Sequence, residues 1–232
     1  MLDYILRSAQ EIQAGLSQSQ KRGRSSWRDA TGQKPIKQKA YLALKLFMDL
    51  GLSIILLPFV GLIATGLLLL NPRFNPGPLM FTQDRLGKHG VPFRIYKFRT
   101  MSADGLGERH ATEALDAHRI GALGAWLRQS RFDELPQILN ILRGEMSFIG
   151  PRPDQLEHAE FYIDHVPHYA GRFAVRPGIS GLAQVTLGYA EGLAQTSAKA
   201  QRDLVYVRRA SFLLDAQITW LTLVSLVARE GR

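Results

Sequence analysis

One segment dominates the pattern of hydrophobic and polar positions along this chain. Leu50–Leu70 is 21 residues long and carries no charge. As a straight helix it would be about 31 Å long, close to the hydrocarbon thickness of a bilayer. Because no polar face interrupts it, we predict a membrane helix; a helix buried in a soluble core is the alternative.

The flanks of this segment and a proline within it predict its path. Pro58 removes a backbone hydrogen bond and predicts a kink. Basic residues stand on both sides: Lys34, Lys37, Lys39 and Lys45 before it, and Arg73, Arg85, Lys88, Arg94, Lys97 and Arg99 after it. Such charges tend to stay in the cytoplasm. We therefore predict a re-entrant helix that returns to the side it entered; a straight span is the alternative.

The remaining pattern predicts an α+β fold that is mainly helical. Three prolines within Asn71–Pro78 end the membrane helix. A small β-hairpin is expected next, from Leu79–Asp84 and Val91–Arg99. The predicted helices are Gly121–Ser130, Glu134–Arg143, Leu156–His165 and Ser211–Ala228, and the predicted turns are Gly144–Pro153 and Arg176–Gly181. The last helix is apolar and weakly amphipathic, so it either packs on the core or lies at the membrane interface.

Composition and charge limit the partners. The 232 residues include 29 Lys and Arg, 20 Asp and Glu and no Cys, for a net charge of +9. Without Cys there is no disulfide scaffold, Cys-bound zinc or thiol nucleophile. The basic balance favours an anionic partner: nucleic acid, an anionic membrane or a phosphorylated substrate. No nucleic-acid-binding motif accompanies the charge, so a nucleic-acid partner is not expected.

The charge is concentrated near the N-terminus. Residues 1–45 carry a net charge of +6. We therefore divide the chain into a basic N-terminal arm and linker (1–44), a re-entrant membrane helix with its turn (45–78) and a catalytic domain (79–232). The cationic arm is predicted to adhere to anionic lipid, where each charge contributes about 1 kcal/mol near the surface.

Asp133 and Glu134 are the candidate catalytic acids. They are predicted to open a helix shortly before Pro136. One interpretation is structural, because acids favour helix N-termini, Asp caps helices and Pro is tolerated in the first turn. The other is chemical: one carboxylate attacks phosphorus while the other binds Mg²⁺. The residues alone leave both open.

Two anions acting on a phosphate need cations nearby. The candidates are Arg85, Lys97, Arg99, Arg128, Arg152 and Arg176. Each could instead be a solvated surface charge. Arg152 and Arg176 stand in turns stiffened by proline, and Arg grips phosphate with two parallel hydrogen bonds. The chain contains no P-loop motif, and Pro167 separates His165 from His168, so no His metal pair is expected.

Five strings occur in order along the chain. They are FTQDRLG (Phe81–Gly87), FRIYKFRTM (Phe93–Met101), LRQSRFDELPQ (Leu127–Gln137), GEMSFIGPRP (Gly144–Pro153) and RPGISGLAQ (Arg176–Gln184). Together they closely resemble the bacterial sugar transferase family, the monotopic polyprenyl-phosphate sugar-1-phosphate transferases. The resemblance runs from about Lys45 to Val227.

The resemblance implies a phosphoglycosyl transferase. Such an enzyme moves a sugar-1-phosphate from a nucleotide diphosphate sugar, here expected to be a UDP-sugar, to undecaprenyl phosphate and releases a nucleoside monophosphate. It starts assembly of an exopolysaccharide or related glycan. By resemblance, Asp133 is the nucleophile of a covalent phosphosugar intermediate and Glu134 is a Mg²⁺ ligand. The basic positions that match the phosphate site are Lys97, Arg128, Arg152 and Arg176.

The resemblance also implies a place in the cell and a set of partners. The enzyme would lie at the cytoplasmic face of the bacterial inner membrane, in contact with lipid and its two substrates; association into a homo-oligomer stays open. One departure is Phe132, preceded by Arg131, where Ser-Leu is more usual before the acidic pair. A non-enzymatic membrane adaptor for polysaccharide assembly is the alternative function.

Overall fold

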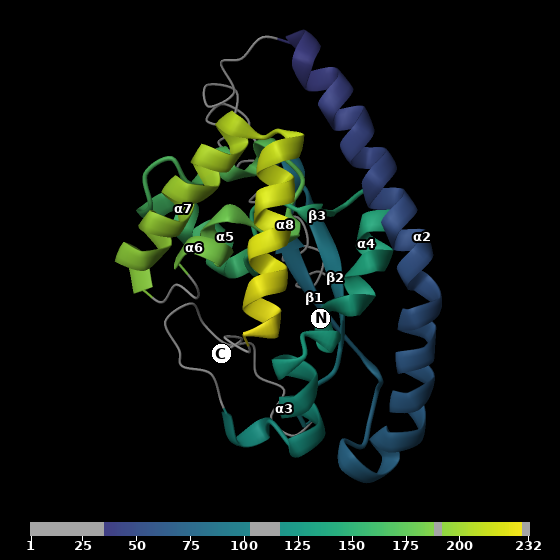
Figure 1. The fold of residues 1–232 in the computed structure, drawn as a ribbon. Helices are drawn as coiled ribbons and strands as arrows, with labels where there is room; N and C mark the ends of the chain where they lie inside the picture. Colours follow the sequence, from purple (N-terminus) through teal and green to yellow (C-terminus); the bar gives the residue numbers. More distant parts are fainter. Residues whose placement is uncertain (1–34, 103–116, 188–191, 229–232) are drawn as a thin grey trace, which may run out of the picture.

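The computed structural model describes residues 35–102, 117–187 and 192–228 (Figure 1). The predicted N-terminal arm, up to residue 34, lies outside them. The helices are α2 (Pro35–Phe74), α3 (Ala122–Gln129), α4 (Ile138–Leu142), α5 (Leu156–His165), α6 (Leu182–Leu187), α7 (Gly192–Arg209) and α8 (Phe212–Val227). The strands are β1 (Met80–Leu86), β2 (Pro92–Phe98), β3 (Ser147–Ile149) and β4 (Gly178–Ser180), and the short 3₁₀ helices are η1 (Lys88–Gly90), η2 (Ala117–Arg119), η3 (Phe132–Gln137) and η4 (Tyr169–Ala174). The fold is mainly helical, as predicted.

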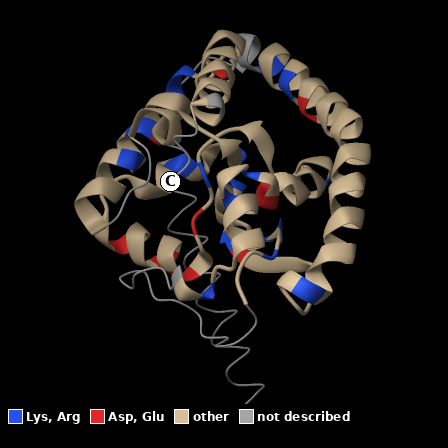
Figure 2. Cartoon of the chain, turned by 60° about the horizontal axis from the view of Figure 1, so that its bottom comes forward, with Lys and Arg blue, Asp and Glu red and all other residues tan. Residues whose placement is uncertain are grey.

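Helix α2 is longer than the apolar segment predicted. It begins at Pro35, so the predicted boundary at Lys45 falls inside it, and it continues through both Pro58 and Pro72. Figure 1 shows it curving along one side of the molecule, and Figure 2 shows its long middle stretch free of charged residues. Within the described chain it is the one helix long and apolar enough to cross a membrane.

The side chains of α2 face outward over much of its length. Ile55 is 73% exposed and Leu69 is 79% exposed. Burying such surface in lipid is favourable, whereas water would penalise it. This exposure distinguishes α2 from a helix buried in a soluble core, and it supports membrane association of the chain.

The predicted hairpin is present, and it is joined by a strand pair that was not predicted. Strands β1 and β2 are antiparallel, with Phe81 opposite Lys97. Strands β3 and β4 are parallel and lie inside segments predicted as turns. Glycine explains both the pairing and the missed prediction: a Cβ atom on Gly178 would lie 2.1 Å from the backbone nitrogen of Gly150. Only glycine allows the two segments to approach so closely, yet glycine in sequence indicates a turn.

Helices α5 to α8 form the other side of the molecule (Figure 1). The predicted helix Leu156–His165 is α5, and the predicted C-terminal helix is α8. Helix α7 was missed by the sequence analysis. In α8, Ile218 is fully buried against Ile149 and Tyr206, whereas Leu213 and Trp220 are 69% and 66% exposed. Helix α8 therefore packs on the core with one face, which confirms the first alternative, and presents an apolar face outward. Its position at a membrane interface stays a prediction.

A buried polar cluster fastens α2 to α8. The Asp215 carboxylate accepts hydrogen bonds from the Tyr41 hydroxyl at 2.8 Å, the Lys45 Nζ at 2.7 Å and the Tyr206 hydroxyl at 2.8 Å. One helical turn beyond Lys45, Asp49 accepts a hydrogen bond from the backbone nitrogen of Phe148 at 3.2 Å. The start of the membrane helix is thus fixed to the last helix and to β3.

Replacing Asp215 by Ala should therefore destabilise the protein. The change leaves the Lys45 ammonium without its carboxylate while only 16% of that side chain is exposed, and breaking such a pair costs about 3 kcal/mol. Thermal unfolding in detergent would measure the loss. Asp84→Ala is the matched control, because its ion pair with Arg94 is more than half exposed and contributes less than about 1 kcal/mol. Equal melting temperatures for the two variants would contradict the prediction.

Candidate active site

The two candidate acids lie in a tight turn between α3 and α4. Arg131 adopts a positive φ of 56°, which reverses the chain after α3, and η3 follows at once. Arg131, not Asp133, stands at the N-cap of η3, and it makes no side-chain capping hydrogen bond. The capping interpretation of Asp133 is therefore wrong. A 3₁₀ helix has three residues per turn, so neighbouring side chains point about 120° apart.

Glu134 is held by two cations from distant segments. Its Oε1 atom accepts a hydrogen bond from Lys97 Nζ of β2 at 2.7 Å. Arg152 donates to both carboxylate oxygens, at 3.1 Å to Oε2 and through a shorter contact to Oε1. Burial by itself would raise the pKa of Glu134, but the charges and hydrogen bonds of Arg152 and Lys97 hold it well below its ordinary value. Glu134 is therefore an anion at neutral pH.

Asp133 has the opposite electrostatic environment. It is 9% exposed, and the hydrogen bonds described above for Lys97 and Arg152 end on Glu134. Burial, and then the negative charge of Glu134, raise the pKa of Asp133 to about 6, although Lys97, Arg128 and Arg152 oppose this. The anion at neutral pH is thus poorly solvated, which suits a nucleophile.

Arg128 approaches Asp133 from helix α3. Its Nε donates to the Thr100 hydroxyl at 2.9 Å, and its charge lowers the pKa of Asp133. The contact requires α3 to lie close to the end of β2. Gly124 allows this, because a Cβ atom there would lie 2.0 Å from the Thr100 carbonyl oxygen. The glycine thereby sets the position of the arginine.

Arg85 completes the group of cations near the acids. Its guanidinium donates to the carbonyl of Pro153 at 2.9 Å and to the Gln83 side chain at 2.6 Å. Burial, and then the neighbouring charge of Arg152, lower the pKa of Arg85 to about 10. The structure therefore gathers four of the six predicted cations around the acids: Arg85, Lys97, Arg128 and Arg152.

Arg99 and Arg176 lie in different surroundings. Arg99 follows β2 and is buried, with its guanidinium donating to the carbonyls of Pro78 at 2.8 Å and Asn75 at 2.6 Å. It fixes the turn that ends α2. Arg176 lies beside Gly144, 3.9 Å from the position of an added Cβ atom, and its charge adds to burial in lowering the pKa of Lys88. The structure does not place these two beside Asp133.

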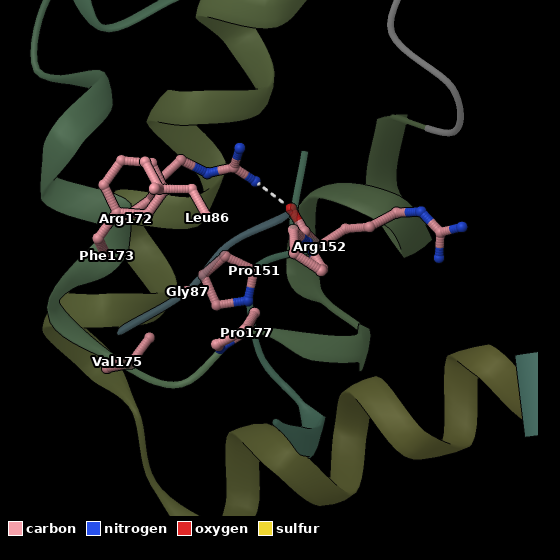
Figure 3. Close-up of a pocket in the computed structure, with 9 residues that line it drawn as sticks. Leu86, Gly87, Pro151, Arg152, Arg172, Phe173, Val175 and Pro177 are labelled. Carbon is pink, nitrogen blue, oxygen red and sulfur yellow. Dashed lines mark hydrogen bonds between the residues drawn. The ribbon is translucent and has the colours of Figure 1, made fainter. Parts of the chain in front are cut away.

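A buried ionic network behind the site was missed by the sequence analysis. Arg172 is 2% exposed on its side chain and pairs with Asp154 and, at 2.7 Å, with Asp203. Its Nη2 also donates to the carbonyl of Arg152 at 2.7 Å. Figure 3 shows this contact, with the Arg152 side chain extending away from it. The network holds the backbone whose side chain grips Glu134. The one local signal was Asp154, two residues after Arg152 and directly after Pro153.

The carboxylate oxygens of the site can be compared with the ligands that Mg²⁺ requires. Among the described residues, no three Asp, Glu, His or Cys side chains come together to hold a metal. A carboxylate offers about four lone-pair sites, and Glu134 uses three of them for Lys97 and Arg152. Asp133 adds its own oxygens. Mg²⁺ often takes only one or two carboxylates and completes its shell with water and substrate phosphates. Glu134, which keeps one lone-pair site, fits that kind of site as a single carboxylate ligand.

Comparison with known proteins identifies the family. Residues 40–229 match the family described as bacterial sugar transferase, and the chain belongs to that family. It is 38% identical over 193 residues to the UDP-N-acetylgalactosamine-undecaprenyl-phosphate N-acetylgalactosaminephosphotransferase of Aeromonas hydrophila, covering 82% of this chain and 45% of that protein.

Two further relatives are similar in sequence. The UDP-glucose:undecaprenyl-phosphate glucose-1-phosphate transferase of Caulobacter vibrioides is 39% identical over 160 residues, covering 68% of this chain and 60% of that protein. The exopolysaccharide production protein PSS of Rhizobium leguminosarum bv. phaseoli is 36% identical over 193 residues, covering 81% of this chain and 94% of that protein. The chain spans about half the length of the first two relatives.

The adjacent acids should affect stability in opposite directions. The raised pKa of Asp133 means that the folded state binds a proton which the unfolded state has released, so stability falls as pH rises from about 4 to about 6. Asp133→Asn should therefore stabilise the protein by up to roughly 3 kcal/mol at pH 8, because each unit by which folding raises the pKa of Asp133 corresponds to about 1.4 kcal/mol.

Glu134→Gln is the matched comparison. Because folding lowers the pKa of Glu134, its carboxylate stabilises the folded protein at pH values above its pKa in the unfolded chain. The variant removes this contribution and leaves Lys97 and Arg152 without a counter-charge, so it should be less stable than wild type at pH 8. Melting temperatures at pH 8 and pH 5 test both statements, and the gain of Asp133→Asn should shrink at pH 5. A lower melting temperature for Asp133→Asn than for wild type at pH 8 would refute this electrostatic assignment.

Proposed function

We propose that this protein transfers a sugar-1-phosphate from a UDP-sugar to undecaprenyl phosphate, with release of UMP. The proposal rests chiefly on one observation: a buried carboxylate, Asp133, stands beside a carboxylate held by Lys97 and Arg152, inside the segment that matches the bacterial sugar transferases. The Aeromonas and Caulobacter relatives carry names that describe this reaction with different sugars.

In the proposed first step Asp133 is the nucleophile. A carboxylate oxygen of Asp133 forms a bond to the phosphorus that carries the sugar, and the bond from that phosphorus to the bridging oxygen breaks. UMP departs with the electron pair, and the sugar phosphate stays on Asp133. Lys97, Arg128 and Arg152 lie where they can offset the charge that develops on the phosphoryl oxygens.

In the proposed second step the acceptor takes the sugar phosphate from the enzyme. A phosphate oxygen of undecaprenyl phosphate attacks the same phosphorus, and the bond to Asp133 breaks, which regenerates the carboxylate. A relay of this kind lets one site meet a water-soluble donor and a lipid acceptor in turn. Glu134 would hold Mg²⁺, which when bound would neutralise phosphate charge.

We further propose that the protein lies at the cytoplasmic face of the bacterial inner membrane, where it initiates exopolysaccharide or a related glycan. The name of the Rhizobium relative refers to exopolysaccharide production. UDP-sugars are cytoplasmic substrates, so the site must face them while α2 contacts lipid. A re-entrant α2 meets both requirements, because it anchors the protein without carrying its catalytic part across.

Asp133→Asn should abolish UMP release from every UDP-sugar that the wild-type protein uses. An amide cannot take the place of the attacking carboxylate, and loss of such a nucleophile costs about a thousandfold or more in rate. Purified protein, a panel of UDP-sugars and undecaprenyl phosphate provide the assay. Mass spectrometry of wild-type protein incubated with donor alone should locate a sugar phosphate on Asp133.

Asp84→Asn is a suitable control, because Asp84 is exposed on the hairpin, where it pairs with Arg94. It should retain wild-type turnover. Near-normal turnover of Asp133→Asn, or a sugar phosphate found on a different residue, would show that the nucleophile is wrongly assigned.

The path of α2 can be tested by cysteine labelling, since the chain has no native Cys. Lys39→Cys and Arg73→Cys place single thiols at exposed positions near the two ends of the helix. A re-entrant helix predicts that a membrane-impermeant reagent labels both from the same side of sealed vesicles. Labelling from opposite sides would mean that α2 spans the bilayer.

A further inference from the structure

Three aromatic side chains meet where α2 borders the turn that carries Asp133 and Glu134. We call this turn the acidic turn. The Phe132 ring lies edge-on to Phe59 of α2, with ring centroids 5.9 Å apart, and to Trp126 of α3, with centroids 5.5 Å apart. The interplanar angles are 86° and 84°. Perpendicular contacts of this kind are favourable and fix ring orientation. The three rings, which we call the aromatic wall, therefore form a defined surface.

The aromatic wall is open on its outer side. Phe59 is 43% exposed and Trp126 is 52% exposed, whereas Phe132 is half-buried and packs against the core beneath. On α2 the exposed surface continues through Ile55 and Leu62, at 73% and 69% exposure. These residues stand four before and three after Phe59, so they share its helix face. An apolar strip thus runs from the membrane helix to the acidic turn.

Two neighbouring residues of the acidic turn have different surroundings, one polar and one apolar. Asp133 is surrounded by the charges of Lys97, Arg128 and Arg152, whereas Phe132 contacts α2 and α3. In a lipid acceptor the hydrocarbon begins one ester bond away from the reacting phosphate. When that phosphate reaches Asp133, the first carbons of the chain must lie against whatever apolar surface borders the turn. The aromatic wall is such a surface.

We propose that the aromatic wall binds the first isoprene units of the lipid acceptor and so guides the chain from the acidic turn onto the exposed face of α2. This inference rests on the proposed function, because it takes undecaprenyl phosphate as the acceptor. Adjacency to the acidic turn favours the acceptor over bulk lipid: other exposed apolar surface, such as Trp220 on α8, lies on a helix that does not carry the acids.

Photocrosslinking tests the location without depending on turnover. The probe is a prenyl phosphate with a diazirine on the isoprene unit next to the phosphate, added to full-length protein in phospholipid nanodiscs. We expect label on the segments that contain Phe59, Trp126 and Phe132, and we expect excess undecaprenyl phosphate to remove it. Label that survives this competition would assign the wall to bulk lipid, and label confined to other segments would overturn the proposal directly.

Kinetics with matched tryptophan variants provide the second test. Trp126→Ala removes a large apolar contact, so it should raise the KM for undecaprenyl phosphate about tenfold, with the KM for the UDP-sugar unchanged. Phe132→Leu, which keeps an apolar side chain, should raise the acceptor KM several-fold. Trp220→Ala is the control for loss of an equally exposed indole, and it should leave the acceptor KM unchanged.

The outcomes separate this inference from the proposed function. If Trp126→Ala and Trp220→Ala change the acceptor KM equally, or neither changes it, the wall is not an acceptor site even though the reaction stands. If wild-type protein releases no UMP from any UDP-sugar, the proposed function fails, and the competition experiment still decides whether prenyl phosphate binds at the wall.

Discussion

Glu134 and its two cations form the interaction on which the arrangement of the site depends. Lys97 comes from β2, Glu134 from η3 and Arg152 from the turn after β3, so three segments far apart in the chain meet at one carboxylate. Charges removed from water are costly unless each is paired and hydrogen-bonded. The triad meets that condition, and Arg172 fastens the Arg152 backbone from behind. This arrangement leaves Asp133, the preceding residue, as the carboxylate with a raised pKa.

The rest of the fold brings an apolar surface to this polar centre. Helix α2 contacts the core through a few residues, among them Val60 and Leu67, and leaves most of its other side chains exposed. The edge-on contact between Phe59 and Phe132 joins the helix to the acidic turn. A reaction between a soluble donor and a lipid acceptor needs such a boundary, because moving the charged donor into hydrocarbon or the hydrocarbon chain into water costs free energy.

Local patterns in the sequence predicted the elements whose signals are local. The uninterrupted apolar run gave α2, alternating residues gave the β1–β2 hairpin, and the helical period gave α3, α5 and α8. Strands β3 and β4 were missed because their pairing relies on close approach at Gly150 and Gly178, and glycine is also the residue of turns. The structural interpretation of Asp133 was right about its place in a first helical turn but wrong about capping, because Arg131, with its positive φ, stands at the N-cap.

The candidate site shows the same division between local and tertiary information. The two acids and four of their cations were identified from short motifs. Arg99 was predicted to end the second strand of the hairpin, yet β2 ends at Phe98 and Arg99 donates to the Asn75 and Pro78 carbonyls. No spacing could pair Arg172 with Asp154 and Asp203, since burial across three elements decides that network.

The Asp215 cluster has a consequence for biosynthesis. Tyr41 and its carboxylate partner are 174 positions apart in the chain, so the clamp cannot close until the ribosome has made the residues between them. Domains generally begin to fold from the N-terminus during synthesis. Helix α2 is therefore made long before α8 exists, and Lys45 and Asp49 lack their partners from later segments during that interval. Docking of α8 onto the start of α2 is thus a late event in folding.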